Sequence, residues 1–579
     1  MSDTRTGGEL FVDALERYGV SHVFGNPGTT ELPVVDAIER SDLEYVLAAH
    51  EDIATGMAAG YASTRRYHAD AAGGRGGEAG DRPEAAEDRE VLPLGVANLH
   101  LAPGLAHGLG NIYGASMAGA PLLVTAGNHA QHFEHEEPLL TGDQEALVDQ
   151  WTKWSATVKD VESLPTMLRR AVRTALTPPT GPVFLSLPVD VAMAETDATV
   201  ERLGAIPTGG RGDEAQVDRA ADLLTDAEDV VLVVGDGVAR SGTDAVDAAV
   251  DLAEAAGARV HAEILACEID FPTGHEQFVS YVPPAEDMAR SLLSVDVLCL
   301  VGCSTNTTLT HREGPLVPED TTCIHVGDDA WELGKNQPAD AAVIGDPGEV
   351  AGQLADRLAD RLDEATREER LADVAAQKEF VGAKMAQMGE DDAADDPRAS
   401  KAELVDALED VAGDAFVVDE GVTSKYAMLT RWDFAPEQYV SNKGGGLGYG
   451  LPAAVGAAIA ESQQAEPRDV LGFVADGSYL YYPHSIYSAV RQDLDLTVVI
   501  PDNRNYRILA DNAAHLLGGE GDDYEWDSIR FDPPVDIPTN AESHGANGHL
   551  VETPDELEDT LETAYGHEGV DVVDALVHD

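Results

Sequence analysis

The sequence is poor in basic residues, cysteine and aromatics. Of its 579 residues, only 37 are Lys or Arg, against 106 Asp or Glu, so that the formal net charge is −69. Lysine is the scarcer cation, with 8 residues against 29 arginines. A chain this acidic repels DNA, RNA and anionic lipid, which argues against a nucleic-acid-binding or membrane-surface protein. Acid enrichment with so little lysine is typical of a protein from a salt-rich cytoplasm, where a Debye length of about 3 Å at molar salt screens the self-repulsion.

Cysteine and long apolar runs are also scarce. The four cysteines, at positions 267, 299, 303 and 323, contain no CxxC pair, so buried thiols are predicted in place of a zinc site or a disulfide framework. The amino-terminal segment has no apolar signal sequence, and no stretch of about 18 apolar residues occurs. We therefore expect a soluble cytoplasmic protein.

Short apolar runs are what the chain does contain. Each is four to eight residues long and is followed by Gly, Asn or Asp and then by a helical pattern, at 121–128, 183–188, 230–237, 295–302, 415–421, 470–477 and 496–503. Runs of this kind are typical of parallel strands that are covered on both faces by helices. The predicted fold class is α/β, with more than one parallel sheet.

Composition divides the chain into three blocks. The predicted domains are 1–195, 217–365 and 401–579, joined by polar linkers at 195–216 and 388–400. Residues 65–90 are rich in Gly, Ala and acids without periodicity, so a disordered surface loop without chemistry is predicted there.

The strongest local motif lies in the last block. One predicted strand ends in Asp476-Gly477-Ser478 and the next ends in Asn503. Both strand ends should face the carboxyl edge of one sheet, where α/β folds place ligands. A carboxylate and an amide oxygen suit Mg²⁺, which prefers oxygen ligands and bridges to phosphate, and Gly477 permits close backbone approach.

This motif resembles the metal–diphosphate motif of the thiamine diphosphate (ThDP) enzymes. Three further segments resemble that family in order along the chain: FGNPGTTELP (24–33), AHEDIATGMAAGYAST (49–64) and KGGGLGYGLPAAVGAAIA (443–460). The resemblance implies pyrimidine-binding, central and diphosphate-binding domains in the three blocks. It also implies a homodimer or homotetramer with active sites at subunit interfaces.

The resemblance further implies which residues bind the cofactor. The metal ligands would be Asp476, Asn503 and Asn505. The ThDP contacts would be Pro27, Gly28, Glu51, Thr423, Ser424, Gly445, Leu447, Gly477, Ser478, Asn505 and Tyr506. Glu51 would activate the cofactor by bonding to its aminopyrimidine ring, and small neighbours such as Ala54, Gly56 and Ala58 would let its helix pack closely.

Two histidines indicate the reaction. His100, in NLHLAPG, and His275, in FPTGHEQF, occupy contexts similar to the two proton-shuttling histidines of the benzoylformate decarboxylases, and Thr29 falls at a substrate-binding hydroxyl position. The implied activity is non-oxidative decarboxylation of a 2-oxo acid. The chain departs from the family pattern at Ala475, Asp502 and His107. The segment after Tyr506 is polar where decarboxylases of aromatic acids have bulky apolar residues, so the substrate stays open.

Other functions remain as alternatives. An acetolactate-synthase-like carboligase would share the cofactor, although the chain has CLVGCSTNTT (299–308) where that enzyme has an Arg-Phe-Asp-Asp run. A non-catalytic ThDP-binding homologue is a second alternative. GDGVAR (235–240) is a weak nucleotide-binding signal, because the third Gly is missing. FAD is therefore not expected, and a nicotinamide dehydrogenase is the most remote alternative.

Overall fold

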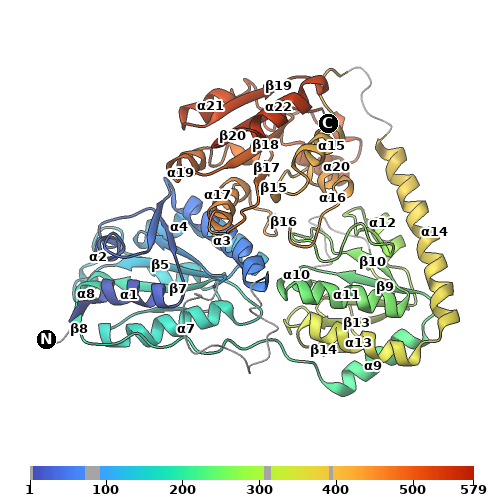
Figure 1. Cartoon of the computed structure of the whole chain (residues 1–579), viewed down its shortest axis with the longest axis horizontal. Helices are drawn as coiled ribbons and strands as arrows, with labels where there is room; N and C mark the ends of the chain where they lie inside the picture. Colours follow the sequence, from blue (N-terminus) through green and yellow to red (C-terminus); the bar gives the residue numbers. More distant parts are fainter. Residues whose placement is uncertain (1–3, 72–91, 305–313, 390–395, 579) are drawn as a thin grey trace.

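The computed structural model of the protein describes residues 4–71, 92–304, 314–389 and 396–578. Within them the chain forms three parallel sheets of six strands, each flanked by helices, and each sheet lies within one of the three predicted domain ranges. The α/β fold class is confirmed. In Figure 1 the first domain lies at the left, the central domain at the lower right and the third domain at the top.

The first sheet has the order β3-β2-β4-β5-β7-β6, and a two-stranded antiparallel pair joins β1 to β8. Its strands are β1 (Arg5–Thr6), β2 (His22–Gly25), β3 (Glu44–Leu47), β4 (Gly95–Leu99), β5 (Leu122–Asn128), β6 (Ser155–Thr157), β7 (Val183–Pro188) and β8 (Glu195–Thr196). The helices are α1 (Gly7–Arg17), α2 (Leu32–Ile38), α3 (Glu51–Ala71), α4 (Leu101–His107), α5 (Leu109–Ala118), α6 (Gln144–Val148), α7 (Leu164–Leu176) and α8 (Val189–Met193).

The central sheet has the order β11-β10-β9-β12-β13-β14. Its strands are β9 (Val230–Val234), β10 (Arg259–Ala262), β11 (Phe278–Tyr281), β12 (Val297–Val301), β13 (Thr322–Gly327) and β14 (Ala341–Ile344). The helices are α9 (Glu214–Asp226), α10 (Gly237–Arg240), α11 (Thr243–Ala256), α12 (Glu286–Leu292), α13 (Pro347–Arg361) and α14 (Glu364–Gly389), of which α14 runs along one side of the molecule toward the third domain (Figure 1).

The third sheet has the order β16-β15-β17-β18-β20-β19. Its strands are β15 (Phe416–Glu420), β16 (Tyr439–Ser441), β17 (Val470–Val474), β18 (Leu496–Asp502), β19 (Asn547–Val551) and β20 (Val570–Leu576). The helices are α15 (Lys401–Ala412), α16 (Lys425–Arg431), α17 (Gly450–Glu461), α18 (Asp476–Tyr479), α19 (Ser485–Arg491), α20 (Arg507–Leu517), α21 (Ile537–Ser543) and α22 (Leu557–Tyr565).

All seven apolar runs contain a strand, namely β5, β7, β9, β12, β15, β17 and β18, and the residues of these strands are almost entirely buried. Both faces of each sheet are covered, which is why the runs are continuously apolar. One hydrophobic cluster extends from the first sheet through α3 and α17 into the third sheet. The central domain has a cluster of its own.

Glycines bring α3 and α17 close together. A Cβ on Gly60 would lie 2.1 Å from the carbonyl oxygen of Ala453, and one on Gly456 would lie 2.0 Å from that of Met57. Because neither side tolerates even a methyl group, the crossing requires glycine. The small residues of the 49–64 segment therefore fix how the first domain sits on the third.

The predicted start of the surface loop at residue 65 is wrong, because α3 continues to Ala71. Arg66 and Tyr67 both bind the buried carboxylate of Glu268 in the central domain, and His68 Nε2 lies 3.0 Å from Glu461 Oε1 in the third. These partners, which are distant in the sequence, stabilise the end of α3, whose polar residues are typical of a loop when the sequence is considered alone. The remaining positions of the predicted loop, 72–90, lie outside the described residues.

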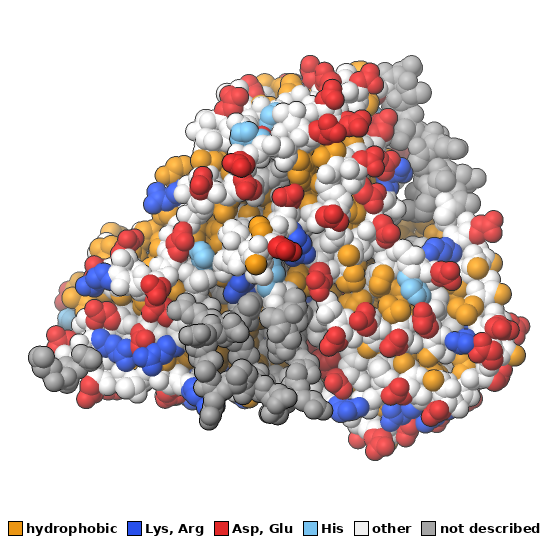
Figure 2. Space-filling view, in the orientation of Figure 1, with side chains coloured by type: hydrophobic (Ala, Val, Ile, Leu, Met, Phe, Trp, Pro, Cys, Tyr) orange, Lys and Arg blue, Asp and Glu red, His pale blue; other side chains and the backbone are white. Residues whose placement is uncertain are grey.

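The scarcity of cysteine, long apolar runs and basic residues is also reflected in the structure. All four cysteines are free, and all but Cys303 are fully buried, as predicted. Among the described residues, no helix is both long and apolar enough to cross a bilayer. Acidic side chains are spread over the face of the molecule seen in Figure 2 and far outnumber basic ones.

The charge leads to a prediction about stability. We expect the midpoint of thermal unfolding to rise by at least about 5 °C between 0.1 M and 2 M KCl, because salt screens the self-repulsion of the folded state. Differential scanning calorimetry at fixed pH measures this midpoint. A midpoint that stays constant over this range would contradict adaptation to a salt-rich cytoplasm.

Candidate functional site

The carboxyl edge of the third sheet brings the predicted metal ligands together. Neighbouring parallel strands β17 and β18 end side by side, and Asp476 begins α18 directly after β17. The backbone N–H of Asn505 donates to both Asp476 Oδ2, at 3.2 Å, and Asn503 Oδ1, at 3.1 Å. Asp476 Oδ1 accepts from the N–H of Gly477 at 2.8 Å. A carboxylate and an amide oxygen therefore converge on one backbone N–H.

Polar atoms at this edge lack partners of their own. Ser478 Oγ and Asn505 Oδ1 are buried and make no hydrogen bond within the described residues. Burial, and then the neighbouring Asp502, raise the pKa of Asp476 to about 8. A divalent cation bound to oxygen ligands would stabilise the charged carboxylate, and phosphate oxygens would accept from Ser478. The residues present thus fit Mg²⁺ with a diphosphate.

A small cavity, of about 40 Å³, lies at these residues. Its lining includes Thr423, Leu447, Asp476, Ser478 and Asn503 and comes entirely from residues 421–508. Gly477 and Tyr506 also line it, and a Cβ on Gly477 would lie 2.4 Å from Tyr506 Cε1, so that a larger residue at 477 would displace the Tyr506 ring. The cavity collects most of the third-domain residues predicted to bind the cofactor.

Two other predicted cofactor contacts lie beside this cavity. Gly445 is exposed, with φ +69°, in the segment 442–449 that connects β16 to α17. Together with Leu447 it lines a second, larger cleft of about 1760 Å³ at the junction of the domains. Ser424 is buried, and its N–H donates to the carbonyl oxygen of Gly421. The structure therefore places Ser424 as a support for the cavity wall.

Glu51 is the first residue of α3 in the first domain. Its side chain is 13% exposed, and its Oε2 lies 3.2 Å from His107 Nδ1. A Cβ on Gly104 would lie 2.7 Å from Glu51 Oε1, so that helix α4 covers the other oxygen closely. The amino end of a 21-residue helix stabilises a carboxylate. Glu51 is thus a largely buried acid with one oxygen in reach of a hydrogen-bond partner.

His100 is held by a glutamate that the sequence did not single out. His100 precedes α4, and its Nδ1 lies 2.7 Å from Glu31 Oε2. The other oxygen of Glu31 accepts from the N–H of Gly127 at 2.8 Å and from Thr30 Oγ1 at 2.9 Å. Because the Glu31 side chain is fully buried, these contacts fix its position. Within the part of the chain that the structure describes, the other imidazole nitrogen of His100, Nε2, makes no hydrogen bond. In the sequence, Glu31 could have been noticed as an acidic residue within the 24–33 motif.

The loop between β2 and α2 completes this first-domain group. A Cβ on Gly28 would lie 2.0 Å from His100 Nδ1, whereas Pro27 and Thr29 are exposed. Gly104 lies next to His100 as well as Glu51, since its Cβ would lie 3.3 Å from His100 Cβ. Gly28 therefore lies against His100, and Gly104 lies close to both His100 and Glu51.

His275 lies elsewhere, in the central domain. Its Nε2 is 3.4 Å from Glu254 Oε1, its ring packs edge-on against Phe271, and its backbone oxygen accepts from Lys378. Within the described residues, its contacts do not include the Glu51 group. A relay role for His275 stays a prediction.

A second set of potential metal ligands surrounds Glu51. Donor atoms of His50, Glu51 and His107 lie within 4.8 Å of one another, and the two imidazole rings stack. Next to them, burial raises the pKa of Asp52 to about 6, although Tyr482 of the third domain donates to it. The contact between His107 and Glu51 accounts for this proximity without a metal.

One chain therefore contains two separate groups of candidate functional residues. The Glu51 group belongs to the first domain, whereas the cavity at Asp476 is lined only by residues of the third. Within the described residues, Glu51 and His100 do not line that cavity.

Comparisons with known proteins assign all three domains. Residues 5–79 match "Thiamine pyrophosphate enzyme, N-terminal TPP binding domain", residues 217–354 match its central domain and residues 419–575 match its C-terminal TPP binding domain. These ranges cover most of the chain and occur in the order of the three sheets.

Whole-length relatives include two kinds of enzyme. The chain is 28% identical to benzoylformate decarboxylase of Pseudomonas aeruginosa, covering 95% of each, and 25% identical to acetolactate synthase of Bacillus subtilis, covering 99% of this chain and 93% of the relative. Among solved structures, the thiamine diphosphate-dependent 4-hydroxybenzoylformate decarboxylase of Rhodococcus jostii is similar, with a TM-score of 0.81, 25% identity and 99% coverage of both chains.

Proposed function

The chain belongs to the thiamine pyrophosphate enzymes, and from that premise we propose that it is a ThDP- and Mg²⁺-dependent decarboxylase of a 2-oxo acid. The observation that carries the choice of reaction is the Glu31–His100 pair beside Glu51. It supplies an oriented proton donor next to the expected cofactor-activating acid. Decarboxylation needs such a donor because the carbon that loses CO₂ must gain a proton.

The residues of the third domain would hold the cofactor. Asp476 and Asn503 would bind Mg²⁺ through a carboxylate and an amide oxygen, together with the backbone carbonyl of Asn505, and Ser478 Oγ would donate to the diphosphate. Leu447 would pack against the ring system. When bound, ThDP supplies the electron sink that accepts the electron pair of the broken C–C bond.

The residues of the first domain would move protons. Glu51 would share a proton through its carboxylate with the aminopyrimidine nitrogen of the cofactor. Buried Glu31 would hold His100 at Nδ1, so that Nε2 delivers a proton to the product carbon and recovers one afterwards. Thr29, exposed on the adjacent loop, would donate a hydrogen bond from its hydroxyl group to the substrate carboxylate.

One active site would need two copies of the chain. The cavity at Asp476 is lined only by the third domain, whereas Glu51 and His100 belong to the first. We propose that the first domain of one copy closes over the third domain of a second copy, giving a homodimer or a pair of such dimers.

The test of the function is product analysis. Benzoylformate, 4-hydroxybenzoylformate, pyruvate and branched 2-oxo acids are each incubated with the enzyme, ThDP and Mg²⁺ in molar KCl. We expect release of CO₂ and the matching aldehyde from at least one acid, and loss of both when EDTA removes the metal. ThDP binding without CO₂ from any acid would contradict the proposal and favour a non-catalytic homologue.

The relatives among acetolactate synthases favour a second candidate, a carboligase. It would convert pyruvate into a condensed hydroxy acid rather than a free aldehyde, and a yellow, FAD-containing preparation would support it. We propose that FAD is not bound. Mass spectrometry of the pyruvate products and the visible spectrum of the purified protein separate the two candidates.

Replacing His100 tests the proton donor. His100→Ala should slow CO₂ release by about 10²- to 10⁴-fold at saturating substrate, the range for loss of a general acid–base group. Glu31→Gln should give a smaller loss, because the imidazole remains but loses its orienting charge. His132→Ala, on an exposed loop, is the matched control. A loss below about threefold for His100→Ala would reduce it to a structural residue.

The same assay decides the role of His275. If His275 takes part in the relay, His275→Ala should also slow CO₂ release by about 10²-fold or more. Activity within about threefold of the parent would remove it from the site.

A further inference from the structure

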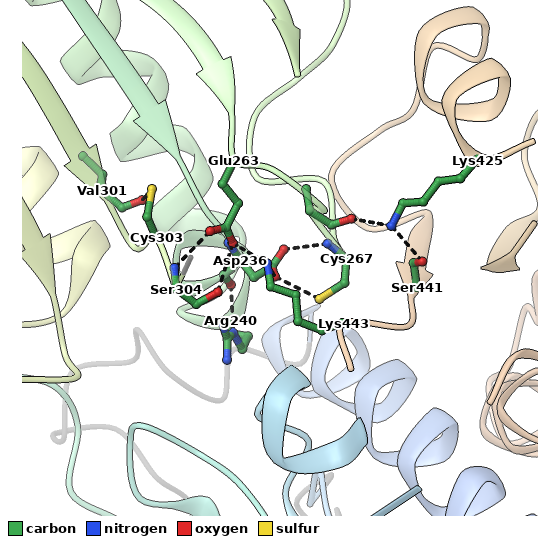
Figure 3. Close-up of polar contacts among 11 residues, drawn as sticks. Asp236, Arg240, Glu263, Cys267, Val301, Cys303, Ser304, Lys425, Ser441 and Lys443 are labelled. Carbon is green, nitrogen blue, oxygen red and sulfur yellow. Dashed lines mark hydrogen bonds and ion pairs between the residues drawn. The ribbon is translucent and has the colours of Figure 1, made fainter. Parts of the chain in front are cut away.

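A residue of another domain reaches the carboxyl edge of the central sheet, beside the reversal of strand order. Strand order reverses between β9 and β12, the place where open α/β sheets bind ligands at the strands' carboxyl ends. Asp236 follows β9 and Glu263 follows β10. Lys443, which comes from the third domain, reaches between these two carboxylates (Figure 3).

Lys443 makes two buried ion pairs there. Its Nζ lies 2.5 Å from Asp236 Oδ2 and 2.7 Å from Glu263 Oε1, and its side chain is 5% exposed, whereas both carboxylates are fully buried. Burial alone would lower the pKa of Lys443, yet the two carboxylates hold it above its usual range. The ammonium group is therefore charged and tightly held.

The carboxylates are themselves fixed within the central domain. Asp236 accepts from the N–H and the thiol of Cys267, at 2.8 and 3.0 Å, and its own N–H donates to Glu263 at 3.0 Å. The N–H of Ser304 donates to Glu263 Oε2 at 3.0 Å. Figure 3 shows these groups arranged around the Lys443 ammonium. The central domain thus presents a rigid, preformed cation site.

Lys443 also belongs to the segment expected to support the cofactor. Segment 442–449 contains Gly445 and Leu447, and Leu447 lines the cavity at Asp476. At the far end, Glu420 accepts from the N–H groups of Gly448, Tyr449 and Gly450 at 3.2, 3.3 and 2.8 Å. Asn442, at the other end, also donates to Glu420, at 3.0 Å. The segment is therefore held to its own sheet at both ends, and Lys443 adds an attachment to the central domain.

We propose that Lys443 is a positioning residue that fixes the cofactor-supporting segment 442–449 from the central domain. The proposal rests on the proposed ThDP function. It gives a role to Asp236, which belongs to the GDGVAR segment (235–240) that lacks the third glycine of a nucleotide-binding motif. Gly445 has φ +69° and is exposed, and the Asn442 side chain accepts from the N–H of Gly445 and donates to the carbonyl oxygen of Gly446. The ion pairs select one conformation and so lower the ordering cost of binding.

The test removes the ion pairs without leaving a buried unpaired charge. Replacing Lys443 alone would leave two buried carboxylates, which is strongly destabilising. The triple variant Lys443→Met, Asp236→Asn, Glu263→Gln is neutral throughout and nearly isosteric. Titration of ThDP with Mg²⁺, followed by tryptophan fluorescence, should show a dissociation constant at least about tenfold higher than that of the parent.

Two further variants separate positioning from general stability. Arg259 bridges Asp229 and Asp373 within the central domain, away from segment 442–449, so Arg259→Met with Asp229→Asn and Asp373→Asn is the matched control. We expect its ThDP affinity to stay within about threefold of the parent. Lys443→Arg keeps the charge, so its ThDP affinity should be closer to that of the parent than to that of the triple variant.

The ThDP affinities of these variants test the positioning role of Lys443 separately from the proposed ThDP function. If the triple variant binds ThDP as tightly as the parent, the positioning role of Lys443 is wrong. If it fails to fold, Asp236→Asn alone, which keeps the Lys443–Glu263 pair, should still weaken binding by more than the roughly threefold change allowed for the control, and a smaller change would overturn the role. If the parent itself does not bind ThDP, the proposed function fails instead.

Discussion

Replacing Glu51 by glutamine is expected to reduce CO₂ release by at least about 10³-fold while ThDP still binds. The substitution keeps the size of the side chain and removes only its charge and basicity. Since Glu51 Oε1 is covered by helix α4 and Oε2 faces His107, the amide fits the same space. The loss should therefore fall on catalysis rather than on folding.

Steady-state rates and a fluorescence titration of ThDP measure the two quantities separately. Glu39→Gln, which changes an exposed glutamate of the same domain, is the control and should retain full activity. Turnover within about tenfold of the parent in Glu51→Gln would contradict the assignment of the cofactor-activating acid.

Replacing Asp476 by asparagine should have an effect of similar size but of another kind. We expect Mg²⁺-dependent ThDP binding to weaken by at least about 100-fold, because the variant loses the carboxylate that shares the Asn505 N–H with Asn503 at the sheet edge. The apo protein should not lose stability. Burial and the charge of Asp502 raise the pKa of both Asp476 and Asp574 to about 8, so that removing one acid relieves repulsion.

Isothermal titration with Mg²⁺ and ThDP, and the unfolding midpoint of the apo protein, test this prediction together. Asp555→Asn, at an exposed position of the same domain, serves as the control. An unchanged ThDP affinity in Asp476→Asn would mean that the metal is bound elsewhere.

Much of the fold could be predicted because parallel strands buried on both faces leave a local signal. All seven apolar runs contain strands, and Asp476 and Asn503 meet because adjacent parallel strands end at the same edge. Glu51 and His100 both lie close to Gly104, and their roles stay predictions.

Contacts between distant segments could not be predicted. Glu31 lies 69 residues from His100, and Arg66 lies 202 residues from Glu268. Single-sequence patterns carry no information about such pairs. For the same reason the end of α3 was placed too early, and nothing in the sequence indicated the buried partners of Lys443, although that residue begins the 443–460 segment.

The central claim is that one active site combines Glu51 from the first domain of one copy with Asp476 from the third domain of another. Neither Glu51→Gln nor Asp476→Asn should be active alone. When both variants are coexpressed with different tags, each mixed dimer should contain one site with both residues intact. Isolated mixed dimers should then release CO₂ at about half the parent rate. Mixed dimers as inactive as either variant alone would show that the site lies within one chain and would contradict the claim.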